Sequence, residues 1–219
     1  PLARGLFKRA VGMSGALIGG AGPAVMRTLS VGEADGERYR ELMKAKSIAD
    51  MRSIPADRLI VPRVPGSPSV GPIQDGYVLP ASIDAIFARG EQNDVPLLLG
   101  FAQDEALGGF GAITGLADYR ARAATRFGDR AAAFLDLYPA SNDAAARTQA
   151  RLADRDETMV TAMKAWALAQ SAHGRAPIYS YMFARPHRYA PGAVLSDHDP
   201  ATAGSYHTSE VPFWLGSLD

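Results

Sequence analysis

Three separated stretches of this sequence carry the residue types of a nucleophilic triad. Ser14 lies in Gly-Met-Ser-Gly-Ala, which nearly matches the G-x-S-x-G turn that exposes a serine nucleophile, with Ala16 in place of the last glycine. The pair Asp104-Glu105 supplies an acid, and His207 supplies an imidazole. In such a set the histidine takes the proton of the serine while the acid orients the imidazole. Ser14 is therefore the first candidate nucleophile.

The acid pair follows a stretch that we expect to be a buried strand. Residues 93–102 form a nearly continuous apolar run, typical of a strand that is covered on both faces of a parallel sheet. Asp104 and Glu105 come just after its carboxyl end, the edge where ligands and catalytic groups collect in open α/β sheets. A solvated acidic loop is the alternative interpretation, but the apolar flanks and the glycines that follow favour a site.

The four histidines differ in what their surroundings favour. His207 follows Gly-Ser-Tyr and precedes an apolar segment, so it could serve as a general base if a carboxylate fixed its tautomer. A surface histidine is the alternative there. His173 lies next to Gly174 at the expected end of a helix, where a cation suits the helix dipole. His187 and His198 lie in a polar, proline-rich loop.

A metal site is conceivable only in Ser-Asp-His-Asp-Pro. His198 could bind a metal together with Asp197 and Asp199. No second histidine stands at a ligand spacing, and the chain has no cysteine, so we expect no metal site.

Helices and strands alternate in the pattern of an α/β fold. Further strands are expected at 9–13 and 177–183, the first a short apolar run and the second alternating and rich in aromatics. Helices are expected at 33–52, 82–90, 116–138 and 142–173. In the last of these, one face carries Met159, Met163, Trp166 and Gln170. Residues 15–25 and 61–72 are rich in glycine or proline and are expected to be loops.

Composition removes several classes of function. The 219 residues include 23 basic and 23 acidic side chains, so no net field recruits nucleic acid or a membrane surface. No run of 18 apolar residues predicts a transmembrane helix. Without cysteine, disulfides and thiolate catalysis are excluded within these residues, while the compartment stays open.

Several stretches, in order along nearly the whole chain, resemble the type-B carboxylesterases, the family that includes the cholinesterases. Pro-Leu-Ala-Arg-Gly-Leu-Phe opens the chain as that family continues after its nucleophile helix. Pro-Leu-Leu-Leu-Gly-x-x-x-Asp-Glu, at 96–105, resembles its approach to the triad acid, and Tyr-His-Thr-Ser-Glu-Val-Pro, at 206–212, resembles its triad histidine segment. These last two stretches are the most specific.

The resemblance implies a role for four residues. Glu105 matches the triad acid and His207 the general base. Ser14 matches a serine that hydrogen-bonds the acid, and Glu210 matches a buried glutamate three residues after the histidine. The nucleophilic serine and the oxyanion-hole loop are then expected upstream of Pro1, so the chain is expected to lack the N-terminal half and the extreme C-terminus of the catalytic domain.

The residues after Ser14 argue independently against a nucleophile there. A nucleophile elbow leads straight into a helix whose N-terminus faces the oxyanion. Ser14 is followed by Gly-Ala-Leu-Ile-Gly-Gly-Ala-Gly-Pro, which cannot begin a stable helix.

The resemblance implies an α/β-hydrolase fold, with residues 1–219 forming its C-terminal part. Its sheet would be mixed and mostly parallel, and a helical insertion would span about 107–173. The implied activity is hydrolysis of carboxylic esters through an acyl-enzyme, with no metal or organic cofactor. The expected partners are a small-molecule ester and the remainder of the same domain, not nucleic acid or a membrane. The alternative is an inactive binding or adhesion protein on the same scaffold.

Overall fold

The computed structural model describes most of the chain. The described residues are 2–15, 18, 26–60, 67–68, 71–105, 110, 112–189, 192, 194, 199 and 203–217. The expected loops at 15–25 and 61–72 lie largely outside them. In the described part, no helix combines the length and apolar character needed to cross a bilayer.

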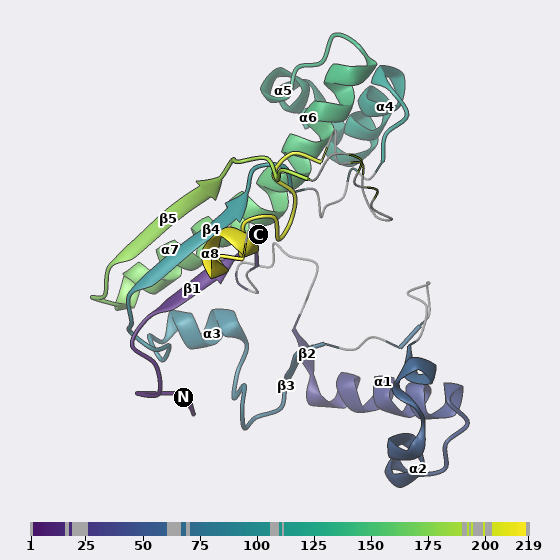
Figure 1. Ribbon diagram of the computed structural model, residues 1–219, viewed down its shortest axis with the longest axis vertical. Coiled ribbons are helices and arrows are strands. Elements are labelled where there is room, and N and C mark those ends of the chain that lie inside the picture. Colours follow the sequence, from purple (N-terminus) through teal and green to yellow (C-terminus); the bar gives the residue numbers. More distant parts are fainter. Residues whose placement is uncertain are drawn as a thin grey trace.

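A three-stranded parallel sheet is the centre of the fold (Figure 1). Its strands are β1 (Ala10–Met13), β4 (Leu97–Ala102) and β5 (Ile178–Phe183), in the order β1-β4-β5. All three predicted strands are confirmed to within a few residues at each end. Because every pairing in this sheet is parallel, the carboxyl ends of the strands meet at one edge.

Each face of this sheet is covered by a helix, because apolar side chains point alternately to the two sides. On one face Leu97 and Leu99 pack with Met163 of α7 (Thr161–His173). On the other, Tyr181 contacts Trp214 of α8 (Val211–Leu215) edge to face. Figure 1 shows α7 along one side of the strands and α8 against the other. The expected α/β class is confirmed.

Three helices form a separate cluster beyond the carboxyl edge of the sheet (Figure 1). They are α4 (Leu116–Phe127), α5 (Ala131–Leu137) and α6 (Asp143–Arg155). Their shared core is aromatic, with the rings of Phe127 and Phe134 stacked at 4.4 Å. The prediction of one helix over 116–138 was wrong, because Gly128 has a φ of +53° and a short 3₁₀ turn separates α4 from α5.

The predicted helix over 142–173 is continuous but contains a wider turn. α6 passes through the π-helical turn η3 (Asp156–Val160) into α7. The predicted inward face is confirmed, since Met159, Met163 and Gln170 are buried. This rod joins the helical cluster to the sheet, so the expected insertion at 107–173 includes one helix, α7, that covers the sheet.

The region between β1 and β4 holds a second, small unit at the lower right of Figure 1. It consists of β2 (Arg27–Thr28) paired in parallel with β3 (Ile73–Gln74), helices α1 (Leu29–Leu42) and α2 (Ile48–Ser53), and the 3₁₀ helix η1 (Ala56–Leu59).

The prediction of a single helix over 33–52 was wrong. Lys44 has a φ of +55°, which breaks the helix, and Ser47 caps a new one by accepting a hydrogen bond from the Asp50 N–H. Within α1, hydrogen bonds from Arg38 and Arg27 hold the pKa of the buried Asp35 below its usual value.

Helix α3 (Ile83–Ala88) follows the predicted pattern closely. Ser82 accepts from the Ala85 N–H at its start, and Gly90, with a φ of +66°, follows its end. It packs against α7 on the side away from the sheet and precedes β4 directly.

Candidate active site

Ser14 and Glu105 are brought together by the ends of two neighbouring strands. Ser14 follows β1 directly, and Glu105 comes three residues after β4. The register pairs Met13 with Gly100, and the Ser14 N–H donates to the Gly100 carbonyl at 2.8 Å. Ser14 has a φ of +53°, which turns the chain away from the sheet at this point. Glu105 thus lies at the carboxyl edge of the sheet, as its position after the apolar run predicted.

Glu105 is a buried carboxylate whose two oxygens face different partners. The residue is 1% exposed. Oε1 accepts hydrogen bonds from the Ser14 hydroxyl and, at 2.9 Å, from the Ala102 N–H. Oε2 lies 3.5 Å from Nδ1 of His207. One oxygen is therefore held by the strand ends, and the other is left for the imidazole.

His207 faces the acid with one nitrogen while its side chain remains 42% exposed. It lies in the turn that leads into α8, next to Thr208, whose φ is +76°. The separation of 3.5 Å from Glu105 is longer than a strong hydrogen bond, as is common where no substrate is bound. An imidazole whose Nδ1 faces a carboxylate has Nε2 available to take a proton from a nucleophile.

Ser14 lies between two buried acids. Its hydroxyl donates to Glu105, and Glu210 Oε1 is 3.4 Å from the Ser14 hydroxyl oxygen. Glu210 is 1% exposed and stands at the start of α8, three residues after His207. Because a hydroxyl has one hydrogen to donate, that hydrogen is engaged by the nearer carboxylate. A nucleophile would instead direct its hydrogen at the imidazole.

Tyr181 is a neighbour of this network that the sequence did not single out. Burial raises the pKa of its phenol to about 12, and the charges of Glu210 and Glu105 add to the shift. Its ring packs against Gly100, where a Cβ would come within 2.2 Å of the ring. The alternating pattern of β5 predicted that Tyr181 faces one side of the sheet, but not that this side borders the acids.

Asp104 and Ser205 also join the two loops of the site. The Ser205 N–H donates to Asp104 Oδ2 at 2.8 Å, across 101 positions of the chain. The sequence offered Asp104 only as a member of an acid pair and gave no signal for Ser205.

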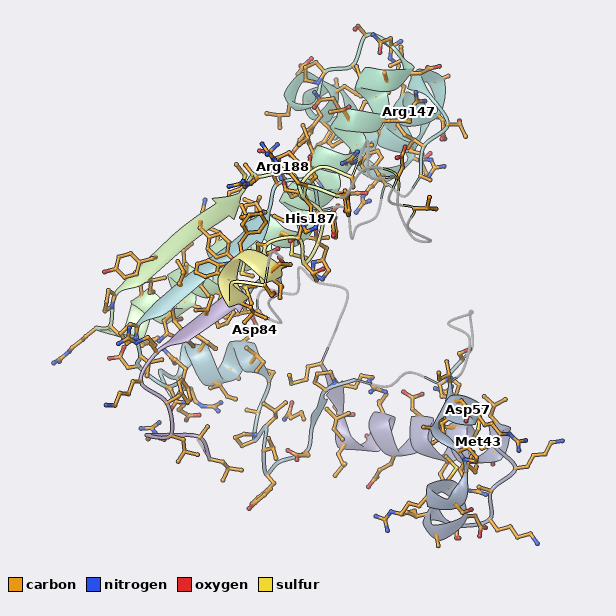
Figure 2. The ribbon with its side chains drawn as sticks, viewed as in Figure 1. Met43, Asp57, Asp84, Arg147, His187 and Arg188 are labelled. Carbon is orange, nitrogen blue, oxygen red and sulfur yellow. The ribbon has the colours of Figure 1, made fainter. Side chains whose placement is uncertain are left out.

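Two of the other histidines, His173 and His187, have described contacts with groups other than Glu105. His173 is the last residue of α7, as predicted, and its side chain packs beside Gly90. Figure 2 shows His187 where the segment after β5 passes the edge of the sheet, and its ring contacts those of Tyr189 and Tyr206. His198 lies outside the described residues. Within the residues that the structure describes, no three metal-binding side chains gather.

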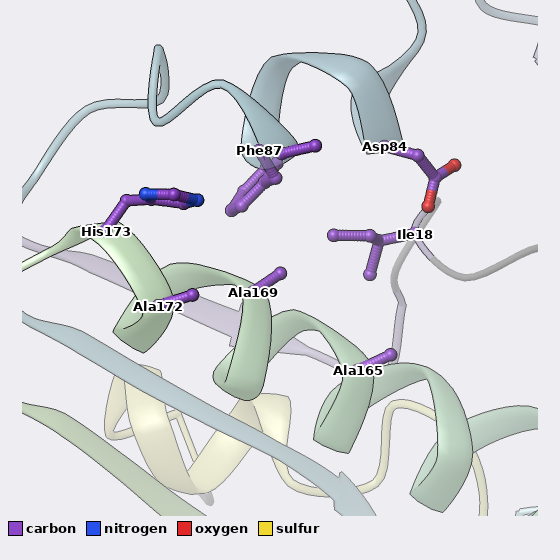
Figure 3. A pocket seen from close by; sticks show the side chains of 8 residues that line it. Ile18, Asp84, Phe87, Ala165, Ala169, Ala172 and His173 are labelled. Atoms are coloured by element: carbon purple, nitrogen blue, oxygen red, sulfur yellow. The ribbon is translucent and has the colours of Figure 1, made fainter.

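Two pockets lie elsewhere in the fold. One, of about 280 Å³ between α3 and α7, is lined by Phe87, three alanines of α7 and His173 (Figure 3). The other, of about 290 Å³, lies against the aromatic core of the helical cluster. Among the described residues that line them, neither pocket includes Glu105 or His207.

Comparison with known proteins places this chain in a family. A family model described as the carboxylesterase family matches residues 1–218. The fumonisin B1 esterase of Sphingopyxis macrogoltabida is 31% identical over 225 residues, covering 100% of this chain and 38% of the relative. The solved structure of a PNB esterase is similar with a TM-score of 0.59 and 23% identity, covering 100% of this chain and 45% of that one. The chain thus spans less than half the length of either relative, and the likeness to the solved structure confirms the α/β-hydrolase fold. The chain belongs to the carboxylesterase family.

Proposed function

We propose that the whole protein hydrolyses carboxylic esters of small molecules through an acyl-enzyme, with Glu105 as the triad acid and His207 as the general base. The single observation that carries the proposal is the approach of His207 Nδ1 to Oε2 of the buried Glu105, at 3.5 Å. Membership of the carboxylesterase family supports the reaction, and both similar proteins are named as esterases.

The nucleophile in this proposal is a serine outside residues 1–219. Ser14 is unsuited because its hydroxyl donates to Glu105 and because the glycine-rich sequence that follows it does not favour a helix. The relatives are more than twice as long as this chain, so the domain that they share has room for the nucleophile and the oxyanion hole in its other part. That remainder of the domain is the partner that we propose for these residues.

The mechanism assigns one task to each group. The serine attacks the ester carbonyl while His207 takes its proton, and the imidazolium then donates that proton to the leaving alcohol. In the second half His207 takes a proton from water, which attacks the acyl-enzyme, and the imidazolium then gives that proton to the serine oxygen as the bond to the acyl group breaks and the acid is released. Throughout, His207 shuttles the proton through Nε2 while Nδ1 stays directed at Glu105.

Glu105 is suited to orient the imidazole and to stabilise the imidazolium. A buried carboxylate without partners is strongly disfavoured. Here Ser14 and the Ala102 N–H both donate to Oε1, which compensates for part of the lost hydration. Glu210 and Ser14 would then support the acid and keep its second oxygen aimed at His207.

Replacing the imidazole tests the proposal. In the whole protein we expect His207→Ala to lower kcat for a nitrophenyl ester by roughly three orders of magnitude or more, as loss of a triad member does. His173→Ala is the matched control, because this histidine is exposed and ends α7 away from the acid. Circular dichroism of both variants checks that the fold is kept. Turnover by His207→Ala at the wild-type rate would refute the proposed base.

A further inference from the structure

We propose that Asp104 and Ser205 are positioning residues, which hold the loop of His207 at a fixed distance from the loop of Glu105. The inference rests on the proposed function, because it gives these residues a purpose only where His207 works with Glu105. Asp104 directly precedes the acid, and Ser205 stands two residues before the base. A contact between them therefore acts close to both reacting loops.

Three hydrogen bonds join these two residues in both directions. The Asp104 N–H donates to the Ser205 carbonyl at 3.0 Å. In return, the Ser205 N–H and hydroxyl donate to Asp104 Oδ2 at 2.8 and 3.1 Å. Ser205 is fully buried, so water does not compete easily for these groups. We call this set of contacts the carboxyl-end clamp.

The clamp lies directly beyond the pairing of β4 with β5. Just past that pairing, the Gln103 N–H donates to the Phe183 carbonyl at 2.8 Å. The next N–H, that of Asp104, donates to the Ser205 carbonyl instead. The histidine loop is thus attached to the turn that follows β4.

Gly204 allows this close seating. Its φ of +62° lies in the left-handed region, and a Cβ there would be 2.3 Å from Asp104 Oδ2. The carboxylate therefore occupies the space that a side chain at position 204 would need. A glycine is required on both grounds, conformation and space.

Two longer hydrogen bonds besides the clamp tie the histidine loop to other segments. The His187 N–H donates to the Gly204 carbonyl at 3.3 Å, and the Ser14 hydroxyl lies 3.4 Å from Glu210 Oε1. The Ser209 N–H donates to the Tyr206 carbonyl at 2.9 Å, which closes the turn around His207 but does not tie it to Glu105. The acid, in contrast, is fixed independently by Ser14 and Ala102. A shift of the loop would thus change the distance between acid and base directly, and misplacement by about 1 Å can cost a hundredfold in rate.

The test uses the whole protein and compares two aspartates at opposite ends of β4. We expect Asp104→Ala to lower kcat about tenfold or more with KM within about twofold, because the clamp aligns the base and does not bind substrate. Asp104→Asn keeps an oxygen that accepts from Ser205 and should restore most of kcat. The matched control is Asp94→Ala, which deletes an aspartate that accepts from the Arg175 and Ala176 N–H groups. It should leave kcat unchanged.

A spectroscopic measurement separates positioning from general loss of structure. The N–H proton that His207 directs at Glu105 gives a downfield proton resonance, which should broaden or disappear in Asp104→Ala and persist in Asp94→Ala. If Asp104→Ala fails to fold, Ser205→Ala removes one hydroxyl and leaves the backbone contacts, and should lower kcat several-fold with KM unchanged.

The outcomes distinguish this inference from the proposed function. Equal kcat in Asp104→Ala, Asp94→Ala and wild type, with the resonance intact, would overturn the clamp while leaving His207 as the base. Equal losses in both aspartate variants would also overturn it, since they would show a structural role alone. Only full activity of His207→Ala would refute the proposed function itself.

Discussion

At each end of β4, an aspartate that faces a glycine joins this strand to another segment of the chain. At the amino ends, Asp94 accepts hydrogen bonds from the Arg175 and Ala176 N–H groups, and Gly174 lies against it. At the carboxyl ends, Asp104 accepts from Ser205, and Gly204 lies against it. A similar contact of an aspartate with backbone N–H groups thus occurs twice, before and after the six residues of β4.

The two ends differ in what the aspartate connects. Asp94 joins the start of β4 to the link between α7 and β5, which are consecutive elements. Asp104 joins the acid loop to a segment that returns to the sheet only some twenty residues after β5. At the amino end, the contact of Asp94 stabilises the connection between α7 and β5. At the carboxyl end, the contact of Asp104 sets the separation of two side chains that we propose to react together.

The largest difference is expected between the two glycines. Gly204→Ala forces a left-handed backbone and a Cβ 2.3 Å from Asp104, so we expect kcat of the whole enzyme to fall about a hundredfold. Gly174 has a φ of −94°, and its Cβ would meet Asp94 and the Gln170 carbonyl at 2.8 Å. Gly174→Ala should therefore cost about 1–3 kcal/mol of stability through crowding but keep kcat within about twofold.

Ester turnover and urea unfolding of both glycine variants check this pair. A loss of kcat in Gly174→Ala as large as that in Gly204→Ala would remove the distinction between the two ends.

Acid should weaken the amino end in a defined direction. Hydrogen bonds from Ala176 and Arg175 hold the pKa of Asp94 below its usual value of 3.8. A lowered pKa means that the contribution to stability is present above the unfolded value and is lost as pH falls through the folded value. Asp94→Asn should therefore lower the urea midpoint at about pH 6 and differ less from wild type at about pH 3. A constant difference at both pH values would contradict this.

The smallest effect is expected for Arg151, which reaches Asp104 from α6. Its Nη2 lies 3.8 Å from Oδ1, and the side chains are 46% and 25% exposed. Exposed pairs at this distance contribute little, so Arg151→Ala should change stability by less than about 0.5 kcal/mol and kcat by less than about twofold. A larger loss of kcat would mean that the helical cluster takes part in the clamp.

The sequence predicted the sheet well because each strand has a local signature. The apolar run of β4, the alternation of β5 and the short run of β1 were all recognisable, and they are confirmed. The helical predictions failed where a single residue decides the backbone. Lys44 adopts a left-handed φ of +55°, which the presence of a lysine does not predict. Gly128 breaks a stretch that is otherwise rich in helix formers.

The candidate site divides in the same way. The position of Glu105 after a buried strand and the candidacy of His207 as a base could be predicted from the residues themselves, whereas the supporting roles proposed for Ser14 and Glu210 came from the family resemblance. The contact between Asp104 and Ser205 could not be predicted, because the two residues are 101 positions apart. The sequence around neither residue indicates that the other is its partner. The place of Tyr181 beside the site could not be predicted for a similar reason, since its neighbours Glu105 and Glu210 come from other segments.

The π-helical turn at Asp156–Val160 sets the rotation of α6 about the helix axis relative to α7. Upstream of that turn, Arg155 points its Nη1 at the Gln103 carbonyl, at 3.1 Å, and downstream Met163 points into the sheet core. Each helical residue advances the rod by about 100°. Deleting one residue from the turn would therefore rotate every upstream side chain by about that angle relative to the sheet. The wide turn therefore sets the rotation that lets Arg155 reach the Gln103 carbonyl while Met163 packs in the sheet core.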